Sequence, residues 1–353
     1  MARKFMTALT AATLVGTMLF TGCGASEALD ADATLVSVDG KEVISAGYGN
    51  FVAKYNQATY DQIYVQYFGS VVWDQQTGEG DETFEESVKT QIMDDLERYY
   101  VSGLHASDYN IALTDDQKKA IAEAAKKLMD ANSEEAIQQL GATEEYAVRF
   151  MEEQTIAQQL QDAIEAEAEV NITDEEAEQS TISYVTFANT KTDDAGNTVE
   201  LDKTELVALK ESAEKLSAAA DFAAEAEAQE LTPQTYSYTK TADPAEDTTL
   251  GEAVIAAAQK LSDGETSAVI EVEGTGYYVV HMEATSDQEA TATKRENLEK
   301  DARNTYYTDK MDAWKKDVDW KVDKKLWGKV TFKEYFTTPE TTEETTAETT
   351  EEE

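Results

Sequence analysis

The sequence ISYVTF at residues 182–187 opens the stretch that decides the fold, residues 181–284 of a chain of 353 residues. Its β-branched and aromatic side chains favour a strand. A helical segment with regularly spaced Leu and Ala side chains follows at residues 206–226. The stretch closes with AQKLSDGETS at residues 258–267 and the apolar run GYYVV at residues 276–280. The pattern predicts a module in which strands flank helices and a Gly-Glu turn precedes the last strand.

This order of elements resembles the parvulin family of peptidyl-prolyl isomerases. The most specific part of the match is the spacing of Leu261, Gly264-Glu265 and Ser267, followed by Gly276-Tyr277. The flanking sequence resembles the two halves of extracytoplasmic foldase lipoproteins of the PrsA/SurA-like kind. The resemblance implies an α+β fold class, with a helical chaperone domain built from the N- and C-terminal segments. This domain would enclose a parvulin-like module with a small, mainly antiparallel sheet at residues 181–284.

The composition limits the partners. The chain has 72 Asp and Glu against 29 Lys and Arg, a formal net charge of -43, and 41% of its residues are hydrophobic. The apolar fraction supports buried cores. The negative surface repels phosphate groups, so nucleic acid is excluded as a partner, and so is a basic membrane-binding patch.

The first residues predict attachment to a membrane by another route. Arg3 and Lys4 precede an apolar run at residues 5–20 that is short for a membrane span. The run ends in LFTGC at residues 19–23, which resembles the lipobox of bacterial lipoproteins. We therefore expect residues 1–22 to be a lipoprotein signal peptide, Cys23 to be the lipidation site, and residues 23–34 to be a tether.

An ordinary signal peptide with an incidental cysteine is the alternative. Cys23 is the only cysteine of the chain, so it cannot form an internal disulfide. Acyl chains on Cys23 would supply a stable anchor. The prediction is an extracytoplasmic protein that is lipid-anchored to the cell membrane.

Residues 35–170 are predicted to form the N-terminal helical chaperone domain, which the resemblance describes as SurA N-like. The domain begins with two short strands around the Asp39-Gly40 turn and a helix at about residues 48–68. Further helices follow, each with its own polar start signal. The residues that mark these starts are Thr83, Thr114, Ser133 and Thr143.

The apolar stripes of these helices are typical of a buried core. A groove of exposed aromatic side chains that binds unfolded clients is the alternative for part of them. The aromatic residues dense enough to suggest such a groove are Tyr48, Tyr60, Tyr64, Tyr67, Phe68 and Trp73.

The C-terminal part of the chain changes character. Residues 294–333 hold more Lys and Arg than Asp and Glu, and Tyr307, Met311, Trp314 and Val318 recur on one helical face. We expect residues 290–336 to pack on the acidic N-terminal domain, as the resemblance to foldases also implies. A solvated amphipathic tail is the alternative. Residues 337–353 alternate Thr with Glu and predict a disordered tail.

The parvulin resemblance also implies a site. Rotation of a prolyl amide meets a barrier of about 18–20 kcal/mol, and parvulins lower it with an apolar proline pocket and a polar cluster that includes two histidines. The first-strand histidine falls on Tyr184, the histidine after Gly-Tyr falls on Tyr278, and the pocket phenylalanine falls on Gln259. Residues 236–249 replace the usual Gly-Gly loop between the helices. The resemblance therefore implies a degenerate site with weak or lost isomerase activity.

Other chemistries find little support. His281 lies three residues beyond Tyr278, so in a strand it points to the opposite face, and His105 is expected to lie in a helical connection without a partner. Two distant histidines and one cysteine form no zinc set. The acidic loop at residues 193–197 lacks the ligand spacing of a calcium loop. No metal and no other cofactor is expected.

The leading interpretation is a membrane-anchored extracytoplasmic foldase or chaperone whose partners are unfolded or newly exported polypeptides. A surface lipoprotein that uses the module as a non-catalytic spacer or adhesion domain is the alternative. A fully active isomerase is a third reading, and it needs Tyr184 and Tyr278 to do the work of histidines. The sequence leaves the oligomeric state open, a homodimer included.

Overall fold

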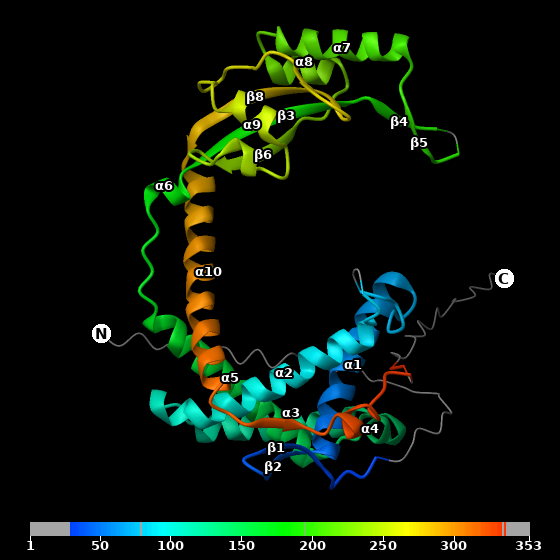
Figure 1. The fold of residues 1–353 in the computed structure, drawn as a ribbon, viewed down its shortest axis with the longest axis vertical. Helices are drawn as coiled ribbons and strands as arrows, with labels where there is room; N and C mark the ends of the chain where they lie inside the picture. Colours follow the sequence, from blue (N-terminus) through cyan, green and yellow to red (C-terminus); the bar gives the residue numbers. More distant parts are fainter. Residues whose placement is uncertain (1–28, 78–79, 194, 334, 337–353) are drawn as a thin grey trace, which may run out of the picture. The chain divides into compact units, whose positions relative to one another are not determined.

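The computed structural model describes residues 29–77, 80–193, 195–333 and 335–336 (Figure 1). The chain divides into two compact units. The first unit combines the described residues up to Glu167 with those from Tyr306 onward, and the second runs from Ala168 to Thr305. The predicted signal peptide, Cys23 and the Thr/Glu tail lie outside the described residues. The domain boundaries predicted from the sequence stay predictions.

A small antiparallel sheet of the first unit joins the two ends of the described chain. Its order is β2 (Lys41–Ser45), β1 (Thr34–Val38) and β9 (Trp320–Val322). Asp39 and Gly40 have positive φ values of 50° and 74°, as a tight hairpin turn requires. The hairpin is therefore confirmed. The pairing of β9 with β1 is new, since three residues give too short a pattern to predict a strand.

The helices of the first unit begin where their caps predict. Thr83 and Thr114 form capping boxes, Ser133 caps the short helix that ends before Gly141, and Thr143 precedes the last helix. The described elements are α1 (Ala46–Phe68), α2 (Phe84–His105), η1 (Ala106–Tyr109), α3 (Asp115–Ala131), α4 (Glu134–Leu140), α5 (Glu144–Glu167), the end of α10 (Gln288–Lys315) and α11 (Lys324–Trp327).

The aromatic residues of α1 divide into a buried and an exposed group. Tyr48 is 0% exposed and Trp73, in the following loop, is 3% exposed, so both belong to the core. The hypothesis of a client groove is wrong for these two side chains. Tyr67 and Phe68, at the end of α1, are 72% and 70% exposed. Only this end of the helix therefore offers aromatic surface to a partner.

The C-terminal segment packs on the N-terminal helices. Tyr307 and Met311 share a buried cluster with Leu160 and Ile164 of α5. Trp314 stacks on His105 at 3.9 Å between ring centroids. The fold-back is therefore seen for the described residues from Tyr306 onward, which are not a solvated tail, whereas residues 290–305 belong to the second unit. The expectation that His105 has no partner is wrong.

Ion pairs add to this contact between the basic and acidic parts of the chain. Lys310 Nζ lies 2.9 Å from Glu167 Oε2, and Lys315 Nζ lies 2.5 Å from Asp94 Oδ1. Lys315 is well shielded, with 14% of its side chain exposed. Because exposed ion pairs contribute about 0–1 kcal/mol each, the apolar cluster supplies most of the stabilisation.

The second unit is a four-stranded antiparallel sheet of order β6 (Gln234–Thr239), β3 (Gln179–Ala188), β8 (Gly276–Asp287) and β7 (Ile270–Val272). Helices α7 (Lys203–Ser217) and α8 (Phe222–Ala228) cover one face, where they pack on Val185 and Phe187 (Figure 1). Helix α9 (Glu252–Ala258) packs on the other face. The remaining described elements are α6 (Asp174–Ala177), β4 (Thr190–Thr192), β5 (Thr198–Glu200), η2 (Pro244–Glu246) and the start of α10.

Gly276 sets the end of the central strand pair. It pairs with Ala188 and has φ 129°, and a Cβ atom at this position would lie 2.1 Å from the carbonyl oxygen of Phe187. Only glycine fits this close approach of two backbones. The α+β fold class is confirmed, with a first unit built from both ends of the chain and a small antiparallel sheet in the second.

Removal of one side chain of the C-terminal segment tests how much the fold-back stabilises the first unit. Met311 is 3% exposed, so Met311→Ala leaves a cavity and is expected to lower the free energy of unfolding by about 2–5 kcal/mol. Thr308→Ala, on the exposed side of the same helix, is the control and is expected to change it by less than about 0.5 kcal/mol. Urea unfolding measures both, and equal effects would contradict the packing.

Candidate functional site

Tyr184 and Tyr278 meet on one face of the sheet. Tyr184 pairs with Val280 and Tyr278 with Thr186, which makes the two tyrosines diagonal neighbours on adjacent strands. Their ring centroids are 6.3 Å apart. The strand register therefore brings together the two tyrosines that the sequence analysis assigned to the histidine positions, and that assignment stays a prediction.

A third tyrosine completes this surface. Tyr236 lies in β6 opposite Ile182 and shares a cluster with Tyr184 and Tyr278, and we call these three residues the tyrosine face. The interpretation of residues 236–249 as a loop is wrong at its start, because β6 extends to Thr239. The alternation of Tyr236 and Tyr238 with polar residues was the signal for this strand.

Two of the three hydroxyls of the tyrosine face are engaged. Tyr184 donates to Gln234 Oε1 at 2.6 Å, and Tyr236 donates to Asp247 Oδ2 at 2.7 Å. Within the described part of the chain, the Tyr278 hydroxyl makes no hydrogen bond. Tyr278 is therefore the phenol with its donor free for a peptide carbonyl.

The protonation of the tyrosine face differs from that of a histidine site. Burial raises the pKa of Tyr184, and the neighbouring Tyr278 raises it further. Burial is also the main cause that raises the pKa of Tyr236. A phenol begins with a pKa of about 10, so these groups stay neutral at physiological pH and act as donors. They cannot exchange a proton near neutrality as an imidazole does.

Asp247 anchors the loop beside the tyrosine face. Its Oδ1 atom accepts hydrogen bonds from the backbone N–H groups of Thr249, Leu250 and Gly251, at 3.0, 2.6 and 3.0 Å. Partial burial raises its pKa, but the hydrogen bonds from Tyr236 and from these backbone groups outweigh burial, so the net pKa is lowered. Asp247 is an ionised positioning residue, and a single Asp in a loop carried no signal for this role.

The hydrogen bonds of Gln259 do not involve the tyrosine face. It is exposed at the end of α9, and its side-chain amide donates to the carbonyl oxygen of Ala242 at 2.9 Å. An amide that fastens a turn supplies no apolar wall for a proline ring. The assignment of Gln259 to a proline pocket is untested and stays a prediction.

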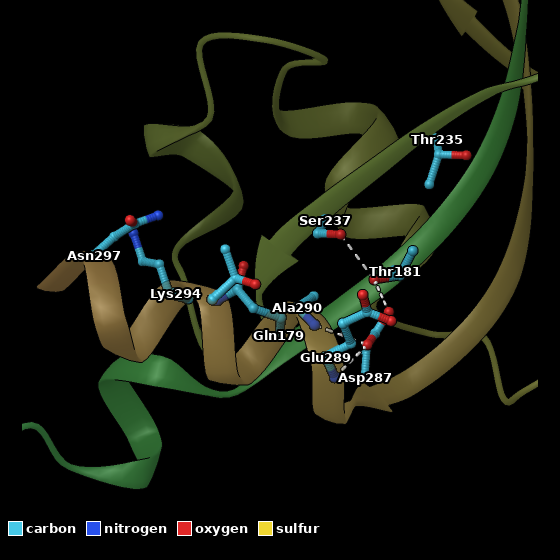
Figure 2. Close-up of a pocket in the computed structure, with 10 residues that line it drawn as sticks. Gln179, Thr181, Thr235, Ser237, Asp287, Glu289, Ala290, Lys294 and Asn297 are labelled. Carbon is cyan, nitrogen blue, oxygen red and sulfur yellow. Dashed lines mark hydrogen bonds between the residues drawn. The ribbon is translucent and has the colours of Figure 1, made fainter.

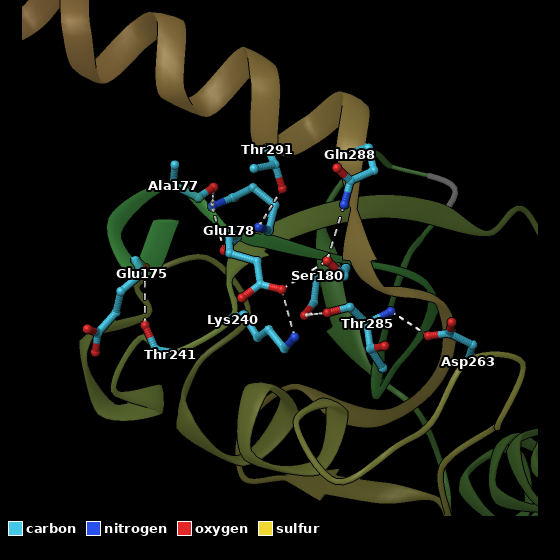
Figure 3. A network of polar contacts seen from close by, with 12 residues as sticks. Glu175, Ala177, Glu178, Ser180, Lys240, Thr241, Asp263, Thr285, Gln288 and Thr291 are labelled. Atoms are coloured by element: carbon cyan, nitrogen blue, oxygen red, sulfur yellow. Dashed lines mark hydrogen bonds and ion pairs between the residues drawn. The ribbon is translucent and has the colours of Figure 1, made fainter. Parts of the chain in front are cut away.

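The Gly-Glu turn is hydrogen-bonded to the sheet. Gly264 N–H donates to the carbonyl oxygen of Met282, and Glu265 Oε2 accepts from Ser262 N–H. Asp263 accepts from Thr285 N–H at 2.6 Å, within a polar network that also holds Glu178 and Lys240 (Figure 3). These contacts explain why this motif is polar although it lies against a buried strand.

His281 belongs to the opposite face from Tyr278, as predicted. Its ring stacks on Phe222 at 5.1 Å between centroids, and its Nδ1 lies 2.9 Å from Thr266 Oγ1. His281 is therefore a packed and hydrogen-bonded strand residue, and it cannot replace a histidine on the tyrosine face.

A polar pocket of about 450 Å³ lies where β3 and β6 meet the start of α10 (Figure 2). Thr181 donates to Asp287 Oδ2 at 2.7 Å, and Thr181 and Ser237 lie 2.8 Å apart through their hydroxyls. Thr181 and Ser237 are strand neighbours of Ile182 and Tyr236, so the pocket opens on the face opposite to the tyrosine face. Its lining is mostly polar, which argues against a proline pocket here.

Metal binding and membrane spans were the two remaining features of the described residues. Among these residues, no group of three or more His, Cys, Asp or Glu side chains is placed to hold a metal ion. In the described ranges, no helix has the length and apolar character to cross a membrane.

Comparison with known proteins defines the class of the second unit. Residues 175–292 match the family described as the PPIC-type PPIase domain. This part of the chain is therefore a parvulin-type peptidyl-prolyl isomerase domain, as the sequence predicted. No significant match was found among curated proteins.

Several solved structures match much of the chain at low identity. One is the foldase protein PrsA from Streptococcus pneumoniae, with 18% identity, a TM-score of 0.30, and coverage of 72% of this chain and 97% of that one. A Campylobacter jejuni structure, titled as one of two SurA-like chaperones, has 14% identity, a TM-score of 0.26, and coverage of 82% and 98%. A peptidylprolyl isomerase (PrsA) from Bacillus anthracis has 15% identity, a TM-score of 0.27, and coverage of 63% and 96%.

The role of Asp247 can be measured by its pH dependence. A lowered pKa in the folded state means that ionised Asp247 stabilises the fold above the unfolded pKa of about 3.9 and that this stabilisation is lost as the pH falls through the folded pKa. Asp247→Asn is expected to cost about 1–2 kcal/mol at pH 7, and this difference should shrink below about pH 3.9. Glu246→Gln, at an exposed neighbour, should have little effect at either pH.

Proposed function

We propose that this protein is a membrane-anchored extracytoplasmic foldase that binds unfolded exported polypeptides and has weak or lost isomerase activity. The observation that carries the proposal is a parvulin-type domain in which Tyr184 and Tyr278 stand at the predicted histidine positions, with the pKa of Tyr184 raised by burial. The domain family supports a role on polypeptides. The chemistry of the tyrosine face supports weak catalysis.

Client binding would use the exposed end of α1, which we call the α1-tip patch. It consists of Ile63, Val65, Tyr67 and Phe68, which are 45%, 36%, 72% and 70% exposed. Behind it, the rings of Tyr64 and Phe84 pack at 5.3 Å between centroids and support the patch. Exposed apolar side chains at the end of a helix suit the binding of extended apolar segments without sequence preference.

The proposal of a membrane anchor is based on the sequence. The lipobox at residues 19–23 and the single cysteine, Cys23, support a lipid anchor on the outer side of the cell membrane. The excess of acidic residues suits a soluble surface outside the cell. Cys23→Ser is the matching variant for a test of lipid attachment.

The α1-tip patch gives the direct test of client binding. Tyr67→Ser with Phe68→Ser is expected to weaken suppression of aggregation of a reduced, unfolded client by about fivefold or more, because two large contact side chains are lost. Val207→Ser is the matched control, since Val207 is 58% exposed on α7. Light scattering measures suppression, and thermal unfolding checks that the variants fold. Equal suppression by all variants would exclude the α1-tip patch.

The tyrosine face gives the test of catalysis. Tyr184→His with Tyr278→His is expected to raise cis–trans conversion of a Xaa-Pro peptide by about tenfold or more, with a new pH dependence near about 6.5. Tyr277→His, on the other face of β8, is the control. A wild-type rate that falls with Tyr278→Ala would mean that the tyrosines already form an active site.

The two assays also separate the proposal from its alternative. Aggregation suppression without isomerase activity fits a holding chaperone on a degenerate isomerase domain. Absence of both activities in the full chain would favour a non-catalytic spacer or adhesion domain.

A further inference from the structure

The C-terminal segment crosses α1 and α2 in an irregular conformation. We call its described residues, 330–333 and 335–336, the strap; they belong to no helix or strand. The main chain of the strap is bound by side chains of the two helices. These contacts join Lys89 Nζ to the carbonyl oxygen of Val330 (2.6 Å), Lys54 Nζ to that of Thr331 (2.5 Å), Gln57 Nε2 to that of Phe332 (3.4 Å), and Asp61 Oδ2 to the N–H of Phe336 (2.9 Å).

The strap also places apolar side chains in the first unit. Val330, Phe332 and Phe336 are 3%, 0% and 1% exposed. Phe332 packs edge-on against Trp73 at 4.7 Å between ring centroids, and Phe336 lies in a separate cluster with Ala58 and Leu140. Two distinct sites therefore receive the two phenylalanines.

Two of the other side chains of the strap are open to solvent. Lys333 is exposed, and Tyr335 is 47% exposed. The strap thus has one buried side and one open side. The side chains of α1 and α2 bind its main-chain carbonyl and N–H groups, which every polypeptide has. Backbone recognition with pockets for spaced side chains is how proteins bind extended peptides.

We propose that the surface beneath the strap is a binding groove for an extended client segment with two aromatic side chains four residues apart. The strap occupies this groove in cis and competes with the client. This inference rests on the proposed function and specifies the substrate class. The seated strap itself defines the occupant, because the groove binds backbone carbonyls through Lys54 and Lys89 and buries aromatic rings at positions 332 and 336.

The strap lowers the apparent affinity for a client, because both occupy the same groove. A client binds only the fraction of molecules in which the strap has left, so its apparent dissociation constant is the intrinsic constant divided by that fraction. Substitutions that loosen the strap without changing the groove should therefore tighten client binding. Substitutions in the groove should weaken it.

The test uses a fluorescein-labelled peptide with the sequence of residues 328–337, GKVTFKEYFT, and the full chain. Phe336→Ala in the protein is expected to tighten peptide binding by at least about tenfold relative to wild type, as measured by fluorescence anisotropy. Adding Lys89→Ala to that variant should reverse the gain. Tyr335→Ala, on the open side of the strap, is the control and should leave the affinity within about twofold.

Two further measurements make the result decisive. If Phe336→Ala fails to fold by circular dichroism, Phe336→Leu takes its place. In the wild-type chain, excess peptide should speed hydrogen exchange at the Phe336 amide and leave β9 unchanged, whereas a peptide with both phenylalanines replaced by alanine should have no effect. No change in exchange, or no gain in affinity in a folded variant, would overturn the inference.

The outcomes also separate this inference from the proposed function. Aggregation suppression by wild type without any peptide effect would reject the groove and keep the chaperone. If the loosened variant dimerises in sedimentation experiments and the dimer excludes the peptide, the occupant is the strap of a second copy and the client assignment is wrong.

Discussion

The return of the C-terminal segment to the N-terminal helices is the constraint on which the first unit depends. β9 completes the sheet of β1 and β2, Met311 fills the cluster at α5, and Phe332 packs against Trp73. These contacts join residues separated by the whole second unit in the sequence. Loop closure over such a distance costs chain entropy, and the buried apolar area must offset it. The unit therefore cannot form from the N-terminal residues alone with the same core.

The unequal distribution of charge supports this return. The chain has a net charge of -43, and its basic C-terminal part supplies Lys310 and Lys315, which pair with Glu167 and Asp94. Single exposed pairs contribute little. Relief of repulsion among the acidic helices acts over a longer range, especially at low salt. The groove beneath the strap also contains two lysines, Lys54 and Lys89. They belong to α1 and α2 and not to the basic C-terminal part.

In the second unit, a parvulin-type scaffold carries different chemistry. The pairing of β3 with β8 includes the close approach at Gly276, and it places Tyr184 and Tyr278 side by side. Burial raises the pKa of Tyr184 and of Tyr236, and the hydroxyl of Tyr236 donates to Asp247. The tyrosine side chains at this face favour donation of a hydrogen bond over exchange of a proton near neutrality.

Interactions between residues close in the sequence determined many of the helices and turns of this protein. Capping boxes at Thr83 and Thr114, the Asp39-Gly40 turn and the apolar periodicity of α5 predicted elements correctly, because each signal acts within a few residues. Alternation along a strand also placed His281 correctly on the face opposite to Tyr278. The tertiary structure alone decided the rest: the burial of Tyr48 and Trp73, the partner of His105, the strand that contains Tyr236, and the strap. These depend on contacts between distant residues, and such contacts leave no periodic pattern in the sequence.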